Sequence, residues 1–333
     1  MTSASVTPTY ARISGWGKHV PARIVTNIEL QERLPTTDEW IVSRTGIRAR
    51  RIAAEDETPS SLGTQAARNA LASAGLTPSD LDLIITATSS PEQIMPATAA
   101  IIQRDLGCGP IGAFDVNAAC SGGLYALAVA SQFVRTGLYR RVLVVGTEVY
   151  SRQLDWDDRG TCILFGDGAG AAVVEASSEP CGVLGIHLAN DPNGLDLITC
   201  RGIINKPAAH RGDSGYLLMN GPAVFKAAVR TMVEASGAAM QQAGFALDEV
   251  DLFIPHQANL RIITSAATQL GLPMARVFTN VENYGNTAAA STLIALCEAA
   301  EAGRLAAGAK LVMAAAGSGL SYAAVAAIWA PNR

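Results

Sequence analysis

The sequence predicts an α/β protein of two similar β/α halves, residues 1–178 and residues 179–333, with mainly parallel sheets covered by helices on both faces. Two observations lead to this fold class. Near-continuous apolar runs, such as LIITAT at residues 83–88 and VLVVGT at residues 142–147, are typical of buried strands and alternate with alanine-rich helical segments. In addition, the order of these segments in the first half is repeated in the second half.

The clearest repeat joins a helix to a strand. Residues 66–85 (AARNALASAGLTPSDLDLII) align without gaps with residues 235–254 (ASGAAMQQAGFALDEVDLFI). Each segment reads as an alanine-rich helix, a glycine, a polar turn and an apolar strand. Gly75 matches Gly244, and a glycine in this position is typical of a helix C-terminus.

Two further pairs of segments follow in the same order. Residues 111–120 (IGAFDVNAAC) resemble residues 275–286 (ARVFTNVENYGN), and residues 140–151 (RRVLVVGTEVYS) correspond to residues 309–320 (AKLVMAAAGSGL). One match could arise because any two β/α units look alike, but three matches in order favour a duplicated unit. We therefore expect two copies related by a pseudo-two-fold axis. The functional site should lie at the seam between them, at the carboxyl ends of strands.

Composition predicts an oligomer, most simply a homodimer. Of the 333 residues, 49% are hydrophobic and only 16% are charged, against roughly 25% charged in an average soluble protein. A low charged fraction means that much of the surface is removed from water, and a subunit interface is one way to do this.

Charge and cysteine spacing exclude several classes of protein. A net charge of −4 argues against nucleic acid as a partner, because binding phosphate backbones requires a basic field. No apolar run is long enough to span a bilayer, and residues 1–17 (MTSASVTPTYARISGWG) lack the pattern of a signal peptide. The six cysteines include no CxxC pair, which argues against a disulfide scaffold or a zinc site and favours the reducing cytoplasm.

A cysteine stands where a strand is expected to turn into a helix. Cys120 lies between the strand-like GAFDV and the helix-like GGLYALAVASQFV. Taken alone, this stretch favours a buried packing cysteine. The alternative is a nucleophile whose pKa is lowered by the positive end of the helix, with Gly122 and Gly123 allowing a substrate to approach closely.

Two polar residues of the second half occupy comparable junctions. His256 follows the strand-like LFIP, and Asn286 lies in a Gly-Asn turn before an alanine-rich helix. Taken alone, His256 reads equally well as a hydrogen-bonded junction histidine and as a catalytic one, whereas Asn286 reads as a helix cap. Together with Cys120 they suggest a different role, because two neutral donors facing a nucleophile suit a carbonyl oxygen that becomes an enolate.

Two glycine-rich segments have different interpretations. The turn at Gly317, Ser318 and Gly319 can direct a backbone N–H toward a developing oxyanion, or it can be an ordinary strand end. Residues 164–174 (LFGDGAGAAVV) do not have GxGxxG spacing and lead into a strand-like run, so we expect a close-packed buried strand and no nucleotide site.

At this point the residues resemble those of a known family. Nearly the whole chain is similar to the β-ketoacyl-acyl carrier protein synthases III, which are condensing enzymes of the thiolase fold. Five motifs in order carry the resemblance: TTDEWIVSRTGIRARRIA (36–53), DVNAACSGGLYAL (115–127), DRGTCILFGDGAGAAV (158–173), PHQANLRI (255–262) and NYGNTAAAS (283–291).

The resemblance implies a layered αβαβα core and a catalytic role for each polar junction residue. Cys120 is expected to take the acyl group from an acyl-CoA. His256 and Asn286 would stabilise the enolate formed when malonyl-acyl carrier protein loses carbon dioxide, and the product would be a 3-oxoacyl-acyl carrier protein. The backbone N–H groups of Cys120 and Ser318 would form the oxyanion hole. Acyl-CoA is a substrate, so neither a cofactor nor a metal is expected.

The resemblance also assigns binding residues. Coenzyme A is expected to contact Trp40, Arg44 and Arg159, since an indole and a guanidinium can sandwich an adenine and arginines bind phosphates. The alternative is that EWIVSRTGIRARR is a solvated basic face. The remaining assignments are Asn259 beside the pantetheine arm, Leu164 and Phe165 along the tunnel, and Lys226, Arg230 and Arg261 as the docking site for an acidic carrier protein.

Three positions depart from the family pattern. Ser318 stands where the family commonly has the middle glycine of a Gly-Gly-Gly turn. Gly123 stands where a bulkier residue is common. Met95 stands where an aromatic residue often closes the primer pocket of the neighbouring subunit. Methionine is flexible and could admit a longer primer.

Three functions remain open on this reading. The first is the enzyme that initiates fatty acid synthesis. The second is a relative in secondary metabolism, making an alkylquinolone or polyketide starter with the same triad. The third is a catalytically silent partner subunit, which would be expected to have lost Cys120 or the pair His256 and Asn286.

Overall fold

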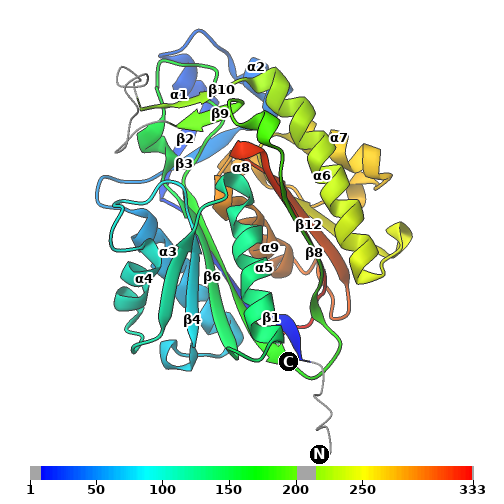
Figure 1. Ribbon diagram of the computed structural model, residues 1–333. Helices are drawn as coiled ribbons and strands as arrows, with labels where there is room; N and C mark the ends of the chain where they lie inside the picture. Colours follow the sequence, from blue (N-terminus) through cyan, green and yellow to red (C-terminus); the bar gives the residue numbers. More distant parts are fainter. Residues whose placement is uncertain (1–8, 201–214, 332–333) are drawn as a thin grey trace, which may run out of the picture.

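The computed structural model describes residues 9–200 and 215–331 (Figure 1). Residues 1–8, part of the segment expected not to be a signal peptide, lie outside the described residues. The strands are β1 Tyr10–His19, β2 Arg23–Thr26, β3 Ala49–Ile52, β4 Leu83–Ala87, β5 Gly112–Val116, β6 Arg141–Glu148, β7 Gly168–Ser177, β8 Gly182–Asn190, β9 Ile198–Cys200, β10 Leu217–Met219, β11 Leu252–Pro255, β12 Lys310–Ala316 and β13 Ser321–Ile328. The α-helices are α1 Asn27–Gln31, α2 Asp38–Thr45, α3 Pro59–Ala74, α4 Thr98–Leu106, α5 Gly122–Arg135, α6 Gly221–Ala243, α7 Leu260–Leu270, α8 Val281–Tyr284 and α9 Ser291–Glu301.

The two main sheets are mixed, so the prediction of mainly parallel sheets is wrong. The first has the order β1-β7-β6-β4-β5 and the second has the order β11-β12-β13-β8. Parallel pairing is confined to β4 with β5 and β6, and to β11 with β12; the other pairs in these sheets are antiparallel. The reason is that the connections from β6 to β7 and from β12 to β13 contain no α-helix, and parallel neighbours usually need a helical crossover.

The two sheets repeat the same arrangement, as the sequence alignment predicts. The pairs β4–β6, β6–β7 and β7–β1 correspond in direction to β11–β12, β12–β13 and β13–β8. Helices α3 and α6 both end at a left-handed glycine, Gly75 and Gly244. The counterpart of β5 is reduced to a single bridge between Phe253 and Val277. The division of the chain at residues 178 and 179 stays a prediction.

The core has five layers, in agreement with the predicted αβαβα order. Helices α5 and α9 lie between the sheets, and their side chains join both sheets in one apolar cluster (Figure 1). Helices α3 and α4 cover the outer face of the first sheet, and α6 and α7 cover that of the second. Residues 164–174 enter β7, whose first eight residues are buried as expected.

The described part of the chain contains no helix that combines the length and the apolar character needed to cross a membrane.

Gly123 allows the two halves to approach closely, so enlarging it should destabilise the protein. A Cβ at this position would lie 2.5 Å from the backbone oxygen of Ala289, which cannot move without displacing the turn before α9. We expect Gly123→Ala to lower the free energy of unfolding by about 2 kcal/mol, measured by urea denaturation. Gly237→Ala in α6 is the matched control, because nothing lies within 4 Å of its Cβ. An unchanged midpoint for Gly123→Ala would contradict this account of the seam.

Candidate active site

Cys120 lies in a strained turn between β5 and α5. The turn is a short 3-10 helix, Ala119–Ser121, and Ala119 has a φ of 47°. A corresponding 3-10 turn, Ala288–Ala290, precedes α9, and Ala288 has a φ of 44°. Left-handed backbone at a residue with a Cβ persists only where the surrounding structure holds it, and such positions cluster at functional sites. The two turns contact each other, so the nucleophile lies directly at the seam.

The two glycines after Cys120 have different neighbours. A Cβ on Gly122 would lie 3.2 Å from Cβ of Ala87 in β4 and 3.4 Å from Cβ of Ala289, whereas one on Gly123 would lie 2.5 Å from the backbone oxygen of Ala289. The expectation that Gly123 makes room for a substrate is therefore wrong. Gly123 makes room for the turn before α9, which explains why a residue larger than glycine is absent at this position.

Burial dominates the acidity of Cys120. Only 8% of the residue is exposed, and desolvation together with the nearby Glu148 raises the pKa of the Cys120 thiol to about 12, against an opposing hydrogen bond with Asn286. The prediction that the helix N-terminus lowers this pKa is wrong for the protein without substrate. A charge on the sulfur loses its hydration here, and a helix end supplies only a partial compensation.

His256 follows β11 and is held in its neutral form. Its backbone N–H donates to Ala314 at 2.7 Å, and its Nδ1 is hydrogen-bonded to the hydroxyl of Ser291 at the start of α9. Burial lowers the pKa of His256 to about 4. The N–H of Gln257 donates to Ser291 Oγ at 3.4 Å, which leaves the hydroxyl proton for His256 Nδ1. In that arrangement Nε2 carries the ring proton and is available as a donor.

Asn286 is a cap and a donor at the same time. Cys120 and His256 follow strands, whereas Asn286 follows the short helix α8. Its Oδ1 accepts the N–H of Ala288 at 2.8 Å, as a capping residue would, so its NH₂ group remains for other partners. That side chain hydrogen-bonds with Cys120.

A buried arginine supports the segment that positions Asn286. The Asn286 backbone pairs with this segment through its N–H to Leu164 O at 2.8 Å and its carbonyl to Gly166 N–H at 3.0 Å. The guanidinium of Arg50 has no exposed surface and donates to the carbonyl of Ile163 at 2.8 Å. Arg50 thus fixes the pocket wall from behind.

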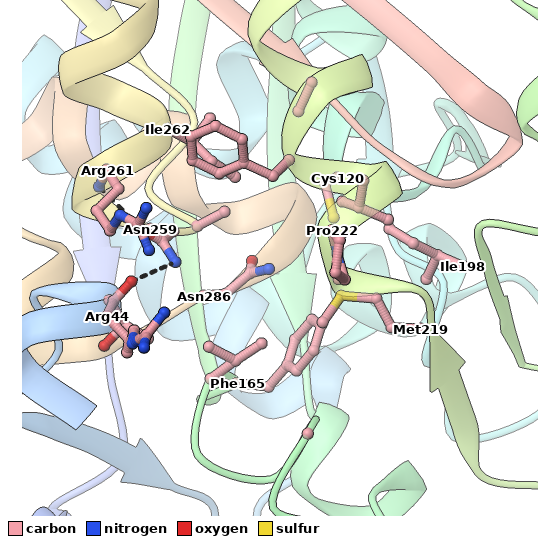
Figure 2. Close-up of a pocket in the computed structure, with 18 of the residues that line it drawn as sticks. Arg44, Cys120, Phe165, Ile198, Met219, Pro222, Asn259, Arg261, Ile262 and Asn286 are labelled. Carbon is pink, nitrogen blue, oxygen red and sulfur yellow. Dashed lines mark hydrogen bonds between the residues drawn. The ribbon is translucent and has the colours of Figure 1, made fainter. Parts of the chain in front are cut away.

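One cavity of about 530 Å³ contains all three residues, Cys120, His256 and Asn286. Figure 2 shows arginine side chains gathered at one end of this pocket, and Cys120 with the apolar Ile198 and Met219 at the other. Leu164 and Phe165 also line it, and the Phe165 ring lies 5.4 Å from that of Tyr150. The cavity thus brings a thiol and two neutral donors together, with an apolar wall beside the thiol.

The residues expected to contact coenzyme A lie at the cationic end. Trp40 in α2 is 37% exposed, and the guanidinium of Arg159 lies 4.8 Å from the centre of its ring. Arg44 approaches the same ring to 5.9 Å. All three residues line the cavity. The indole face is therefore occupied by Arg159 in the protein without ligand.

The other expected contacts are already partly engaged. Asn259 lines the cavity, but its NH₂ group donates to the carbonyl of Arg44 at 3.2 Å (Figure 2). Lys226 and Arg261 line the cavity, whereas Arg230 forms an ion pair with Asp191 at 2.9 Å.

Ser318 and Met95 have different environments. The turn containing Ser318 lies against the nucleophile, since a Cβ on Gly317 would be 2.7 Å from the Cys120 backbone nitrogen. The Ser318 hydroxyl donates to the carbonyl of Ile198 at 2.6 Å. Met95 is 83% exposed and does not line the cavity of its own chain.

Sequence reasoning missed three groups of residues around this site. Ser291 orients His256, and nothing in the sequence pairs this serine with a histidine 35 residues away. The apolar wall of Ile198 and Met219 lies on two very short strands with little sequence signal. Glu148 lies just after the predicted strand at residues 142–147, and nothing in the sequence indicates that burial raises its pKa to about 7 beside Cys120.

Comparison with known proteins gives a consistent result. Residues 114–192 match the family model 3-oxoacyl-[acyl-carrier-protein (ACP)] synthase III, and residues 240–329 match the model of its C-terminal part. A beta-ketoacyl-[acyl-carrier-protein] synthase III from Methylococcus capsulatus is 48% identical over 316 residues, covering 94% of this chain and 97% of the relative.

Solved structures show the same fold. The 3-oxoacyl-[acyl-carrier-protein] synthase III of Aquifex aeolicus has a TM-score of 0.91 at 43% identity, covering 96% of this chain and 100% of that one. The priming beta-ketosynthase of the R1128 polyketide pathway also has a TM-score of 0.91, at 36% identity, covering 99% of both chains. The chain therefore belongs to the 3-oxoacyl-acyl carrier protein synthase III family, with its thiolase-like fold, and is an acyltransferase.

Proposed function

We propose that this chain condenses an acyl-CoA primer with malonyl-acyl carrier protein to give a 3-oxoacyl-acyl carrier protein, the step that initiates fatty acid synthesis. One observation carries the proposal. Cys120 from the first half meets His256 and Asn286 from the second half in one cavity, whose other end carries Trp40 and arginines. That cavity joins a site for acyl transfer to a site suited to an anionic nucleotide.

The first half-reaction moves the acyl group to Cys120. The sulfur attacks the thioester carbonyl, the C–S bond to coenzyme A breaks, and the thiol proton passes to the departing coenzyme A sulfur. The backbone N–H groups of Cys120 and Ser318 hold the oxyanion that forms in between. Because burial raises the pKa of Cys120 to about 12, its sulfur carries a proton at neutral pH and must lose it in the course of the attack.

The second half-reaction forms the carbon–carbon bond. Malonyl-acyl carrier protein loses carbon dioxide, and the electron pair moves onto the thioester, giving an enolate. His256 Nε2–H and the Asn286 amide donate to the enolate oxygen. The enolate carbon attacks the acyl-Cys120 carbonyl, and the Cys120 sulfur leaves and regains a proton. Neutral donors suit this step, because burial lowers the pKa of His256 to about 4 and keeps it uncharged at neutral pH.

Docking of the carrier protein is a further part of the proposal. Lys226 and Arg261 line the cavity, and Arg230 lies on the same helix as Lys226. These three basic residues are proposed to meet an acidic carrier protein. The polyketide alternative uses the same chemistry, and the similarity to the R1128 priming enzyme supports it as the second candidate function. The identity of the carrier protein that accepts the product distinguishes the two pathways. A silent subunit is disfavoured because all three reactive residues are present and meet in one cavity.

The two half-reactions can be measured separately. Incubation with acyl-CoA should add one acyl mass to Cys120, and malonyl-acyl carrier protein should then remove it as 3-oxoacyl product, both followed by mass spectrometry. Cys120→Ala should take no label while its circular dichroism is unchanged. His256→Ala should be acylated but should decarboxylate the malonyl carrier roughly 100-fold more slowly. Acylation without condensation would contradict the proposed reaction, and equal losses in both steps would contradict the division of roles.

The pH dependence of alkylation tests the state of the nucleophile. Because burial raises the pKa of Cys120 to about 12, the thiolate fraction should rise about tenfold per pH unit from about pH 7 to about pH 9. The rate of iodoacetamide labelling of the Cys120 peptide should rise in the same way. Cys120→Ser gives the background from Cys200, the exposed cysteine. A rate already level at pH 7 would mean that the helix end controls the thiol.

A homodimer in the cytoplasm is also part of the proposal. Strand β5 is the edge of the first sheet, is only partly buried, and carries no lysine or proline to block pairing with another chain. We place the two-fold contact along this strand. Met95, 83% exposed in the single chain, would then reach the primer pocket of the neighbouring subunit.

Light scattering tests the dimer. The chain should have twice the monomer mass in solution, and Phe114→Lys on β5 should shift it toward the monomer by adding a charge to the paired edge. Leu247→Lys is the control, because Leu247 is 36% exposed and lies in the second half, away from β5. A monomeric wild type, or equal effects of both substitutions, would contradict this interface.

A further inference from the structure

The side chain of Ser318 makes a contact that a glycine could not make. Its hydroxyl donates to the backbone carbonyl of Ile198 at 2.6 Å. The two residues are 120 positions apart in the chain, so the bond joins separate segments. The family resemblance leads one to expect glycine at this position, which would leave the carbonyl of Ile198 without this donor.

The segment held by Ser318 forms the apolar end of the cavity. Strands β9 and β10 are antiparallel, and Ile198 lies opposite Met219. Both side chains line the cavity beside Cys120 (Figure 2). Leu217 on β10 belongs to the same buried cluster as Cys120 and Phe165. These strands are only three residues long, so their position depends on what they are attached to.

The turn that carries Ser318 is itself firmly placed. The backbones of Leu320 and Asp191 exchange two N–H to carbonyl bonds of 3.0 Å. The N–H of Gly317 donates to Ser321 at 2.7 Å, and Gly317 packs against the Cys120 backbone. The hydroxyl of Ser318 links this turn to the cavity wall through the carbonyl of Ile198.

We propose that Ser318 is a specificity-determining residue whose hydroxyl fixes the wall formed by Ile198 and Met219 and thereby limits the acyl chain that can lie beside Cys120. The inference rests on the proposed function, in which this end of the cavity receives the primer. Removal of the hydroxyl frees one attachment of the wall. Longer acyl chains then displace Ile198 and Met219 more easily, whereas a two-carbon acyl group does not reach them.

The test compares kcat/KM for octanoyl-CoA and acetyl-CoA in the full chain. Ser318→Ala and Ser318→Gly should both raise the octanoyl-to-acetyl ratio roughly five-fold, the effect of losing one hydrogen bond. Ser318→Thr, which keeps a hydroxyl, should retain the wild-type ratio. The ratio is the proper readout because the backbone N–H remains in every variant, and a change in the oxyanion hole would scale both primers alike.

Several outcomes would overturn the proposal. The first is an unchanged octanoyl-to-acetyl ratio in both Ser318→Ala and Ser318→Gly. The second is a changed ratio in Ser318→Gly alone, because that result would point to backbone freedom and not to the hydroxyl. Hydrogen exchange gives a readout that needs no turnover: the amides of β9 and β10 should exchange faster in Ser318→Ala than in the wild type. If the wild type acylates Cys120 with neither primer, the proposed function has failed, and the exchange rates alone then decide whether Ser318 holds the wall.

Discussion

The fold depends on the contact between the backbones of its two halves. The carbonyl oxygen of Ala289 lies 2.5 Å from the points where residues 123 and 146 would carry a Cβ, and both residues are glycine. This contact brings α5 and α9 together between the sheets and sets the turn of Cys120 against the turn at Ala288–Ala290. A nucleophile from one half and two donors from the other can then share a cavity. Duplication alone would not achieve this, because two copies placed further apart would leave each junction facing water.

The titratable groups closest to Cys120 are buried. Burial raises the pKa of Cys120 and of Glu148, lowers that of His256, and raises that of Tyr150. Each of these shifts favours the neutral form of its group. The carboxyl group of Glu148 is nevertheless satisfied by the hydroxyls of Ser89 and Ser90. In the proposed reaction, charge on the reacting atoms therefore develops in buried surroundings, where fixed dipoles act more strongly than they would in water.

The sequence predicted the parts of this molecule that depend on local pattern. Internal repetition predicted the matching sheets, and the glycines after α3 and α6 predicted the helix ends, because left-handed backbone favours glycine. Strand direction was not predictable from apolar runs, since a buried strand reads the same in either direction. The acidity of Cys120 was misjudged because the helix end is visible in sequence while burial is not. The bonds from Ser291 to His256 and from Ser318 to Ile198 join distant residues and leave no trace in spacing.

The stacking of Arg159 on Trp40 has a consequence for how tightly a nucleotide can be held. A ring that enters between them must first separate a guanidinium and an indole that already touch at 4.8 Å. On the proposed function, binding thus exchanges one cation–π contact for another, and only the difference contributes to affinity. If the proposed function holds, this limited gain in affinity favours the release of coenzyme A in every cycle, and the contact between Arg159 and Trp40 keeps the shape of the site between cycles.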